Sequence, residues 1–362
     1  MLALPLAFAF PALWASARSR LTAAAVSAAY FLAASRGLPQ GVANFYGASL
    51  VWGLGLWMAA SLVFVCVHGM LWSPRSGWRK AGGFGVAALL MSVPPFGVVG
   101  WAHPITGAGV LFPALGWVGL ALAALSLLAM TSRWWSVTAL ALASCWIWSA
   151  ANWTAPPVPP GWVAVDMAAG ARLGRAPELD AQRVLMSKVE KAAASGARVI
   201  LLPESALGLW TPTLERFWVE AVGQRGITMI AGAAVVHPDG YENVLVEVSD
   251  SAAGVLYRER MPVPVSMWQP WRSWMGEGAG AHAGFFNNPV VEVEGRPVAA
   301  LICYEQLIVW PFVQSMLHGP KAIITAGNGW WTAGTNIIAI QRSSSQAWAR
   351  LFGLPLVTAF NI

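Results

Sequence analysis

Residues 298–305 read Val298-Ala299-Ala300-Leu301-Ile302-Cys303-Tyr304-Glu305, an apolar strand that ends in a thiol and continues directly into polar residues. A cysteine at a strand-to-helix junction can have its thiolate stabilised by the helix N-terminus and can be deprotonated by a nearby carboxylate. Taken alone, such a cysteine is more often a buried, inert packing residue. The stretch predicts an α/β fold, and Cys303 becomes a candidate nucleophile only if the chain offers a partner.

A candidate partner lies earlier in the chain, in Leu201-Leu202-Pro203-Glu204-Ser205. Its carboxylate follows the C-terminal end of an apolar strand, which is where α/β folds place catalytic groups. Burial among apolar neighbours raises the pKa of a carboxyl group, so Glu204 could serve as a general base near neutral pH. The alternative is a solvated or helix-capping glutamate without a catalytic role.

The sequence around these two motifs alternates between strand and helix patterns. Helix periodicity is found in three places, and hairpin turn signals such as Glu294-Gly295 stand beside strand-helix-strand units. This mixture favours a layered α/β sandwich over residues 162–362. Strands are expected at 162–166, 199–202, 227–236, 243–249, 253–257, 290–293, 297–303, 321–326 and 355–360, and helices at 178–195, 305–317 and 335–351.

The first half of the chain has a different composition. Overall, 57% of the residues are apolar, 10% are charged and the mean hydropathy is +0.57. Met1 to Val165 contains no Asp or Glu and seven Lys or Arg, most of which flank apolar runs. The net charge of +6 therefore indicates membrane topology, and we expect no direct nucleic-acid binding. No Cys or His residues have metal-ligand spacing, so we predict no metal and no cofactor.

Apolar runs divide the first half into candidate membrane spans. They predict a polytopic membrane domain of five or six helices over residues 1–151, followed by a proline-rich linker at 152–161. The basic residues cluster in alternate loops, which places residues 152–362 on the face opposite the cytoplasm. The runs cover residues 2–16, 21–35, 42–70, 81–102, 107–130 and 134–151.

The chain resembles the apolipoprotein N-acyltransferase branch of the nitrilase (carbon-nitrogen hydrolase) superfamily. The resemblance is carried by two motifs that follow an apolar half, Leu202-Pro203-Glu204-Ser205 and Ile302-Cys303-Tyr304-Glu305. The resemblance implies an α-β-β-α sandwich after the membrane domain and a Glu-Lys-Cys triad, with Glu204 as base and Cys303 as acyl-accepting nucleophile. It also implies that Glu305 supports the site and that Asn328 and Trp331 line the pocket.

Within this branch, the segments Trp268-Gln269-Pro270-Trp271 and Gly327-Asn328-Gly329-Trp330-Trp331 are most similar to members that serve conjugative plasmid transfer. The resemblance implies a multi-pass protein of the bacterial inner membrane, with residues 152–362 on the periplasmic side. The chain ends at Ile362, shortly after the strand expected at 355–360. We therefore expect it to lack the family's last strands and its C-terminal membrane helix.

The lysine of the triad has no counterpart in this sequence. The family pattern Tyr-x-Lys aligns with Tyr257-Arg258-Glu259, which places Glu259 at the lysine position. Only a local bulge would bring Arg258 or Arg260 there instead. A guanidinium can donate hydrogen bonds to an oxyanion, but it cannot transfer protons at neutral pH.

Two functional hypotheses follow. In the first, the chain is a membrane-anchored, thiol-dependent enzyme that transfers acyl groups or hydrolyses amides through a Cys303 acyl-enzyme, with a membrane lipid or an acylated molecule as substrate. In the second, it is a catalytically impaired relative that acts as a membrane factor in assembly of the conjugation apparatus and binds envelope proteins of that system.

Overall fold

The computed structural model describes residues 3–75, 77–172, 179–250, 252–278 and 280–362. The described residues divide into two compact units. The first is helical and contains the chain up to Pro156 together with two later segments, Leu307–Trp310 and Thr332–Leu354. The second contains the sheets and the remaining segments, Pro157–Gln306, Pro311–Trp331 and Pro355–Ile362.

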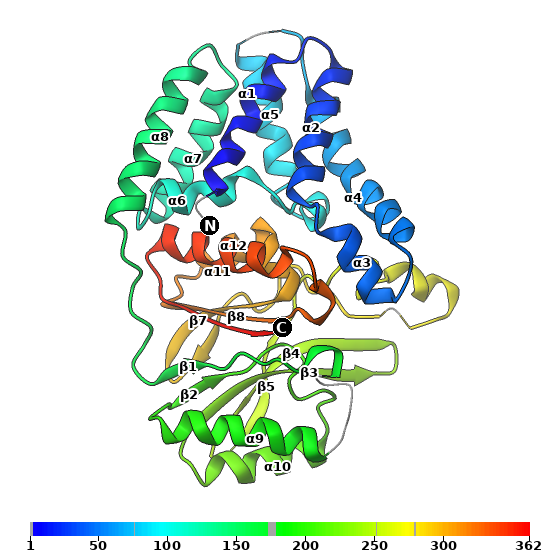
Figure 1. Cartoon of the computed structure of the whole chain (residues 1–362), viewed down its shortest axis with the longest axis vertical. Helices are drawn as coiled ribbons and strands as arrows, with labels where there is room; N and C mark the ends of the chain where they lie inside the picture. The colour runs from blue at the N-terminus through cyan, green and yellow to red at the C-terminus, as the bar shows by residue number, and fades with distance from the viewer. Residues whose placement is uncertain (1–2, 76, 173–178, 251, 279) are drawn as a thin grey trace. The chain divides into compact units, whose positions relative to one another are not determined.

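The second unit contains two sheets (Figure 1). The five-stranded sheet has the order β1-β2-β3-β4-β5, in which β1, β2 and β3 are parallel and β4 and β5 continue as antiparallel hairpins. The four-stranded sheet has the order β6-β7-β8-β9, with β7, β8 and β9 parallel. The strands are β1 Trp162–Ala164, β2 Val199–Leu201, β3 Thr228–His237, β4 Gly240–Val248, β5 Ala253–Arg258, β6 Val291–Val293, β7 Arg296–Ile302, β8 Ala322–Asn328 and β9 Leu356–Asn361.

The two sheets pack face to face, and helices cover the outer face of the five-stranded sheet. Successive side chains of a strand point to opposite faces, so Val199 and Leu201 of β2 enter the core between the sheets. Ile200 and Leu202 enter the second core instead, beneath α9 (Leu179–Ala194) and α10 (Pro212–Gly223). Figure 1 shows these two helices on the side of the five-stranded sheet away from β7 and β8. The predicted α/β sandwich is therefore present.

Most predicted elements of this unit are found within a few residues of their expected bounds, but α10 was missed. Its signals are local: Thr211 caps the first turn by accepting a hydrogen bond from the Leu214 amide, and Pro212 occupies the first turn, where a missing N–H costs nothing. The Trp218 indole then donates to Gln182 at 2.9 Å and ties α10 to α9. Residue 178, the predicted start of α9, lies outside the described residues.

The first unit is built from short helices. They are α1 Ala9–Ser16, α2 Arg20–Ala34, α3 Leu38–Tyr46, α4 Leu50–Leu71, α5 Trp78–Leu90, α6 Ala108–Leu111, α7 Gly116–Met130 and α8 Trp135–Asn152, joined later in the chain by α11 (Val309–Met316, in part) and α12 (Ile337–Phe352). Short 3₁₀ turns lie among them at Leu4–Phe8, Phe96–Val99 and Pro104–Gly107.

The prediction of a polytopic membrane domain is wrong. Among the described residues, only α4 is by itself long and apolar enough to cross a membrane, and the pair α2 and α3, bent by 55°, would add a second crossing if counted as one span. A helix rises about 1.5 Å per residue, so α7, with 15 residues, is too short for a hydrocarbon core about 30 Å thick. Hydropathy identified the apolar runs, but it did not show where the backbone turns within them.

Those turns have identifiable causes. The run 42–70 is broken where Gly47 adopts a left-handed conformation and ends α3. The run 81–102 leaves the α-helix after Leu90, shortly before Pro94-Pro95. The run 107–130 is divided around Pro113, between α6 and α7. The second and third interruptions replace a predicted span by shorter helical pieces, whereas the first leaves α4 long enough to cross a membrane.

The helix α12 belongs to the first unit although it follows the sheet strands in sequence. It packs closely on α6, where a Cβ added to Gly109 would lie 1.6 Å from the Ala347 carbonyl oxygen. The Ala114 amide donates to the Arg350 carbonyl at 2.8 Å, and the Arg350 guanidinium donates to the Ser149 carbonyl and hydroxyl oxygens, each at 2.6 Å. Segments far apart in sequence therefore share one helical core.

Candidate active site

Glu204 lies in the loop that follows β2, and backbone hydrogen bonds to β3 hold this loop. The Gly232 amide donates to the Pro203 carbonyl at 3.1 Å, and the Leu207 amide donates to the Gly232 carbonyl at 2.9 Å. The loop approaches so closely that a Cβ on Gly232 would lie 2.4 Å from the Glu204 Cα. Glycine is therefore required at residue 232 for the loop to hold Glu204 in this place.

Cys303 follows β7 directly and is 5% exposed. Its φ angle is +42°, in the left-handed region that a non-glycine residue seldom adopts. Such strained residues concentrate at functional sites, where the surrounding structure holds them in place. The turn lifts the thiol out of the strand register and presents it to Glu204.

The Glu204 carboxylate accepts three hydrogen bonds from distant parts of the chain. The Cys303 thiol is one donor. The Asn243 side chain donates to Oε1 at 2.8 Å, and the Asn328 backbone amide donates to Oε2 at 2.9 Å. Burial nevertheless raises the pKa of Glu204 to about 7, because desolvation of the carboxylate outweighs the three bonds that favour its charged form. Glu204 therefore titrates near neutral pH while it contacts the thiol.

Glu259 lies beside Glu204, and one amide nitrogen bridges them. The Asn243 Nδ2 atom donates to Glu204 at 2.8 Å and to Glu259 Oε2 at 2.9 Å. Glu259 is 3% exposed. Burial, followed by the neighbouring charge of Glu204, raises the pKa of Glu259 well above its usual range. Two carboxyl groups so close do not both ionise readily, and Glu259 is the one that keeps its proton.

Glu305 belongs to an adjoining buried cluster. The Tyr257 hydroxyl donates to both carboxylate oxygens at 2.8 Å, and the backbone amides of Arg260 and Ile302 donate to one oxygen each, also at 2.8 Å. The Arg260 guanidinium lies 3.6 Å from Glu305 and compensates its charge. Because the Ile302 amide directly precedes Cys303, Glu305 fixes the backbone from which the nucleophile projects.

Neither arginine replaces the family lysine. The Arg260 guanidinium is turned toward α11, where it donates to Gln314, to the Pro311 carbonyl and to Ser315. The Arg258 side chain is 53% exposed and donates to Glu242 at 3.0 Å. Glu259, which lies between these two arginines in sequence, instead shares the Asn243 amide with Glu204.

The two remaining predicted residues differ in what they bring to the site. Asn328 ends β8 and contributes its backbone amide, while its side-chain oxygen accepts a hydrogen bond from Asn361 at 2.8 Å. Trp331 is half-buried in the 3₁₀ turn Trp330–Thr332. Asn243, a polar residue at the start of the apolar strand predicted at 243–249, was not among the predicted site residues.

The arrangement can support nucleophilic catalysis. A thiol is hydrogen-bonded to a carboxylate that titrates near pH 7, so the proton can pass between them without a large cost in free energy. A neighbouring carboxyl group stays neutral, and a buried arginine balances the third glutamate. These are the parts needed for thiol attack on a carbonyl carbon.

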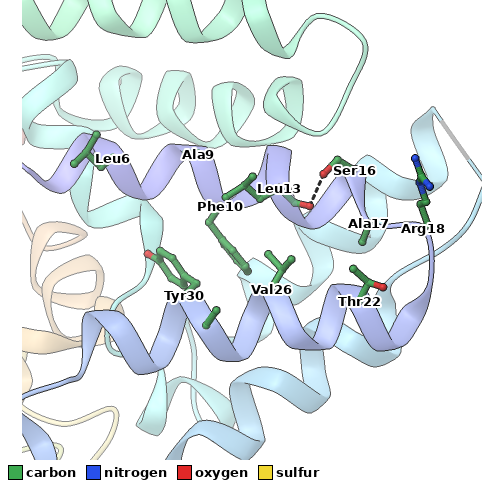
Figure 2. Close-up of a pocket in the computed structure, with 11 residues that line it drawn as sticks. Leu6, Ala9, Phe10, Leu13, Ser16, Ala17, Arg18, Thr22, Val26 and Tyr30 are labelled. Carbon is green, nitrogen blue, oxygen red and sulfur yellow. Dashed lines mark hydrogen bonds between the residues drawn. The ribbon is translucent and has the colours of Figure 1, made fainter.

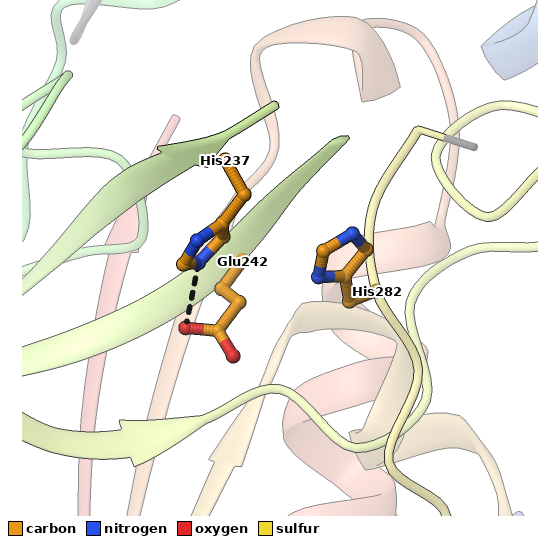
Figure 3. A group of neighbouring side chains, drawn as sticks. All are labelled: His237, Glu242 and His282. Carbon is orange, nitrogen blue, oxygen red and sulfur yellow. Dashed lines mark ion pairs between the residues drawn. The ribbon is translucent and has the colours of Figure 1, made fainter. Parts of the chain in front are cut away.

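A second cluster of titratable side chains could contact a cation (Figure 3). His237, Glu242 and His282 each offer one ligand atom, and these atoms lie within 4.8 Å of one another. A tetrahedral zinc ion would require ligand atoms about 3.4 Å apart. Both Glu242 oxygens also accept hydrogen bonds from Arg258. A bound metal would have to displace Arg258 and draw the side chains together, so we assign no metal here.

The helical unit contains a cavity of about 510 Å³ between the N-terminal helical segment and α2 (Figure 2). Its lining is mostly apolar and includes Leu6, Phe10, Val26 and Tyr30, with Arg18 at one end. None of its lining residues belongs to the Glu204–Cys303 site.

Comparison with known proteins gives relatives of nearly full length. Conjugal transfer protein TraB of Agrobacterium fabrum is 56% identical over 370 residues, which cover 99% of this chain and 88% of the relative. Probable conjugal transfer protein TraB of Sinorhizobium fredii is 55% identical over 360 residues, covering 99% and 93%. Among solved structures, an amidase from Nesterenkonia sp. is 16% identical with a TM-score of 0.40, covering 57% of this chain and 80% of the amidase.

The family model for carbon-nitrogen hydrolases matches residues 32–350, which is most of the chain. The match includes both Glu204 and Cys303. With the two relatives of nearly full length, it shows that the chain belongs to the carbon-nitrogen hydrolase family of the nitrilase superfamily.

Proposed function

We propose that the protein is a thiol-dependent enzyme that transfers an acyl group to an amine or hydrolyses an amide. The observation that supports this most strongly is the contact between the Cys303 thiol and Glu204, whose pKa is raised to about 7 by burial. A structural cysteine needs no base, whereas a nucleophilic cysteine does. The left-handed backbone at Cys303, with φ of +42°, supports the same assignment.

The proposed reaction proceeds through a thioester. As the Cys303 sulfur attacks the carbonyl carbon, its proton passes to Glu204 and the C=O electron pair moves to oxygen. The tetrahedral intermediate collapses and expels the amine of an amide substrate or the alcohol of a lipid ester, which takes the proton from Glu204. Water or an acceptor amine then attacks the thioester and gives its proton to Glu204. Collapse of this second intermediate expels the thiolate, which recovers the proton.

The setting proposed for this chemistry comes from the relatives, which are named for conjugal transfer. We propose that the substrate is a membrane lipid or an acylated molecule of the cell envelope, and that partners are envelope proteins of a conjugation system. The exposed apolar side chains of α4 support attachment of the helical unit to the inner membrane: Leu50, Val51, Trp52, Met58, Leu62 and Met70.

We also propose that residues 152–362 face the periplasm. A reporter enzyme that is active only in the periplasm, fused after Ile362, should be active. A cytoplasmic reporter fused at the same position should then be inactive. The reverse result contradicts this location.

A second candidate function is favoured by Glu259, which stands where the family has its lysine. Loss of a cationic oxyanion donor would impair acyl transfer by about 100- to 1000-fold. In that case the protein would act as a factor for assembly of the conjugation apparatus and would use its sandwich domain for binding.

The experiment that separates the two functions is trapping of an acyl-enzyme. The purified protein is incubated with p-nitrophenyl acetate, and acetylated peptides are located by mass spectrometry. We expect acetylation of Cys303, which Cys303→Ala abolishes and Glu204→Gln slows, while Cys66 and Cys145 serve as internal controls. A Cys303 no more reactive than Cys66 would reject the enzyme and favour the binding factor.

A further inference from the structure

Glu259 is a buried carboxyl group without a cationic partner. Its side chain is 3% exposed, and no ion pair involves it among the residues that the structure describes. The guanidinium groups of its two sequence neighbours are engaged elsewhere, Arg258 with Glu242 and Arg260 with the cluster around Glu305. An isolated carboxylate is very costly to bury, so such a group takes up a proton instead.

The hydrogen bonds indicate which oxygen holds that proton. Oε2 of Glu259 accepts from Asn243 at 2.9 Å, so the proton resides on Oε1. Oε1 is buried and has no hydrogen-bond partner within the described part of the chain. A protonated carboxyl group has one O–H donor, and the described residues provide no acceptor for the one on Glu259. Buried polar groups normally have partners, which points to an acceptor outside the chain.

The position of Glu259 identifies that acceptor. Asn243 Nδ2 holds Glu259 on one side and Glu204 on the other, at 2.9 and 2.8 Å. Glu204 in turn accepts from the Cys303 thiol. Glu259 is therefore connected to the nucleophile through Asn243 and Glu204, the base that an attacking thiol needs.

The other titratable groups around Glu259 favour its neutral form. Glu204 and Glu305 both repel a negative charge on it. Tyr241, on the same face of β4 as Asn243, is affected by the charges of Glu259 and Glu204 and is itself neutral at physiological pH, since its pKa is raised mainly by burial. Arg260, the nearby cation, is paired with Glu305 and Tyr257.

We infer that Glu259 is held as a neutral carboxylic acid and that its Oε1–H donates a hydrogen bond to the oxyanion formed when Cys303 attacks an acyl carbon. This inference rests on the proposed function. An apolar site can keep a carboxylic acid neutral at pH 7 so that it donates to an oxyanion. In this chain the neutral carboxyl group of Glu259 thereby replaces the cationic oxyanion donor that the family lysine provides.

The test compares two reactions of Cys303 that differ in whether an oxyanion forms. Acetylation by p-nitrophenyl acetate passes through a tetrahedral oxyanion, whereas alkylation by iodoacetamide does not. The variants are Glu259→Met, which removes the donor at similar length, and Glu259→Gln, which keeps an N–H donor. Glu292→Gln on the exposed side of β6 is the matched control, and thermal unfolding verifies that each variant is folded.

We expect Glu259→Met to slow acetylation by about 100- to 1000-fold and to leave alkylation unchanged, while Glu259→Gln keeps most of the acetylation rate. The ratio of acetylation to alkylation should fall at high pH in the parent protein, where Glu259 ionises, but not in Glu259→Gln. The infrared absorption of protonated carboxyl groups at neutral pH should lose one component in Glu259→Gln, while the component from Glu204, whose pKa is about 7, remains.

Three results would overturn the inference. If Glu259→Met leaves acetylation unchanged, Glu259 is not the oxyanion donor, and the proposed function stands. Acetylation and alkylation slowed by the same factor show that Glu259 only positions the thiol. Failure of the parent protein to become acetylated at Cys303 rejects the proposed function and this inference with it.

Discussion

Three buried glutamates lie near one thiol, and they differ in what compensates their charge. Glu305 has the Arg260 guanidinium and the Tyr257 hydroxyl. Glu204 has a side-chain amide, a backbone amide and the thiol, and no cation among the residues described by the structure. Glu259 accepts one hydrogen bond from the described residues, that of Asn243. These differences in charge compensation give each carboxyl group a different role. Glu305 is a structural anchor, Glu204 is a proton acceptor and Glu259 is a neutral hydrogen-bond donor.

Asn243 joins two of these groups, and its replacement tests the arrangement. Asn243→Leu removes a hydrogen bond from each carboxyl group at similar volume, so we expect a loss of about 1–3 kcal/mol in the free energy of unfolding. Because the Asn243 bond lowers the pKa of Glu204, the pH at which Cys303 alkylation reaches half its maximum should rise. Urea unfolding and the pH profile measure the two effects. An unchanged profile contradicts the bridging role.

The buried and the exposed arginine should differ in their contribution to stability. Arg260→Met leaves Glu305 buried without a cation, and breaking such a pair costs about 3–5 kcal/mol. Arg258→Met removes a largely exposed pair with Glu242 and should cost about 0.2–1 kcal/mol. Both are measured by urea unfolding. Equal effects would mean that Arg260 does not compensate Glu305.

At the scale of elements, the site is assembled at the C-terminal ends of parallel strands. Glu204 follows β2, Cys303 follows β7 and Asn328 ends β8, while the antiparallel β4 and the end of β5 contribute Asn243 and Glu259. The sequence allowed prediction of these strands and of Glu204 and Cys303, because apolar periodicity and the two motifs are local. It did not reveal Asn243, because a hydrogen bond between residues far apart in sequence leaves no periodic trace.

The approach of the Glu204 loop to β3 gives a prediction at this scale. Gly232→Ala places a Cβ 2.4 Å from the Glu204 Cα, so the loop must move away. We expect a loss of about 1–3 kcal/mol from overpacking and a clear loss of Cys303 acetylation, since Glu204 moves with the loop. Gly254→Ala on β5, where the added Cβ meets nothing within 4 Å, is the control. Normal acetylation in Gly232→Ala would show that the loop position is not needed.

At the scale of the whole molecule, the chain forms two units whose segments are not continuous in sequence. Apolar composition divides the chain into an apolar half and an α/β half, but it does not show that α12 is part of the helical unit. It also led to the wrong prediction of a polytopic membrane domain, because hydropathy averages over the turns near Pro94 and Pro113. Packing between distant segments decides where α12 belongs, whereas local turns decide how long each apolar helix is.

The contact between α6 and α12 can be tested by substitution. Gly109→Ala places a Cβ 1.6 Å from the Ala347 carbonyl oxygen, so the two helices must separate. We expect a loss of about 1–3 kcal/mol, measured as a lower temperature of thermal unfolding. Gly55→Ala in α4 meets nothing within 4 Å and should be neutral or stabilising by about 0.5–1 kcal/mol. A neutral Gly109→Ala would contradict the packing of α12 in this unit.

The central claim is that Glu204 activates Cys303, and the most direct measurement is the rate of Cys303 alkylation by iodoacetamide against pH in the parent protein and in Glu204→Gln. Because Glu204 accepts the thiol proton only when ionised, and its pKa is raised to about 7, the parent rate should fall as the pH drops through about 7. Glu204→Gln should react slowly at pH 7 and follow an ordinary thiol with a pKa of about 8.5. Identical profiles in the two proteins would contradict the account.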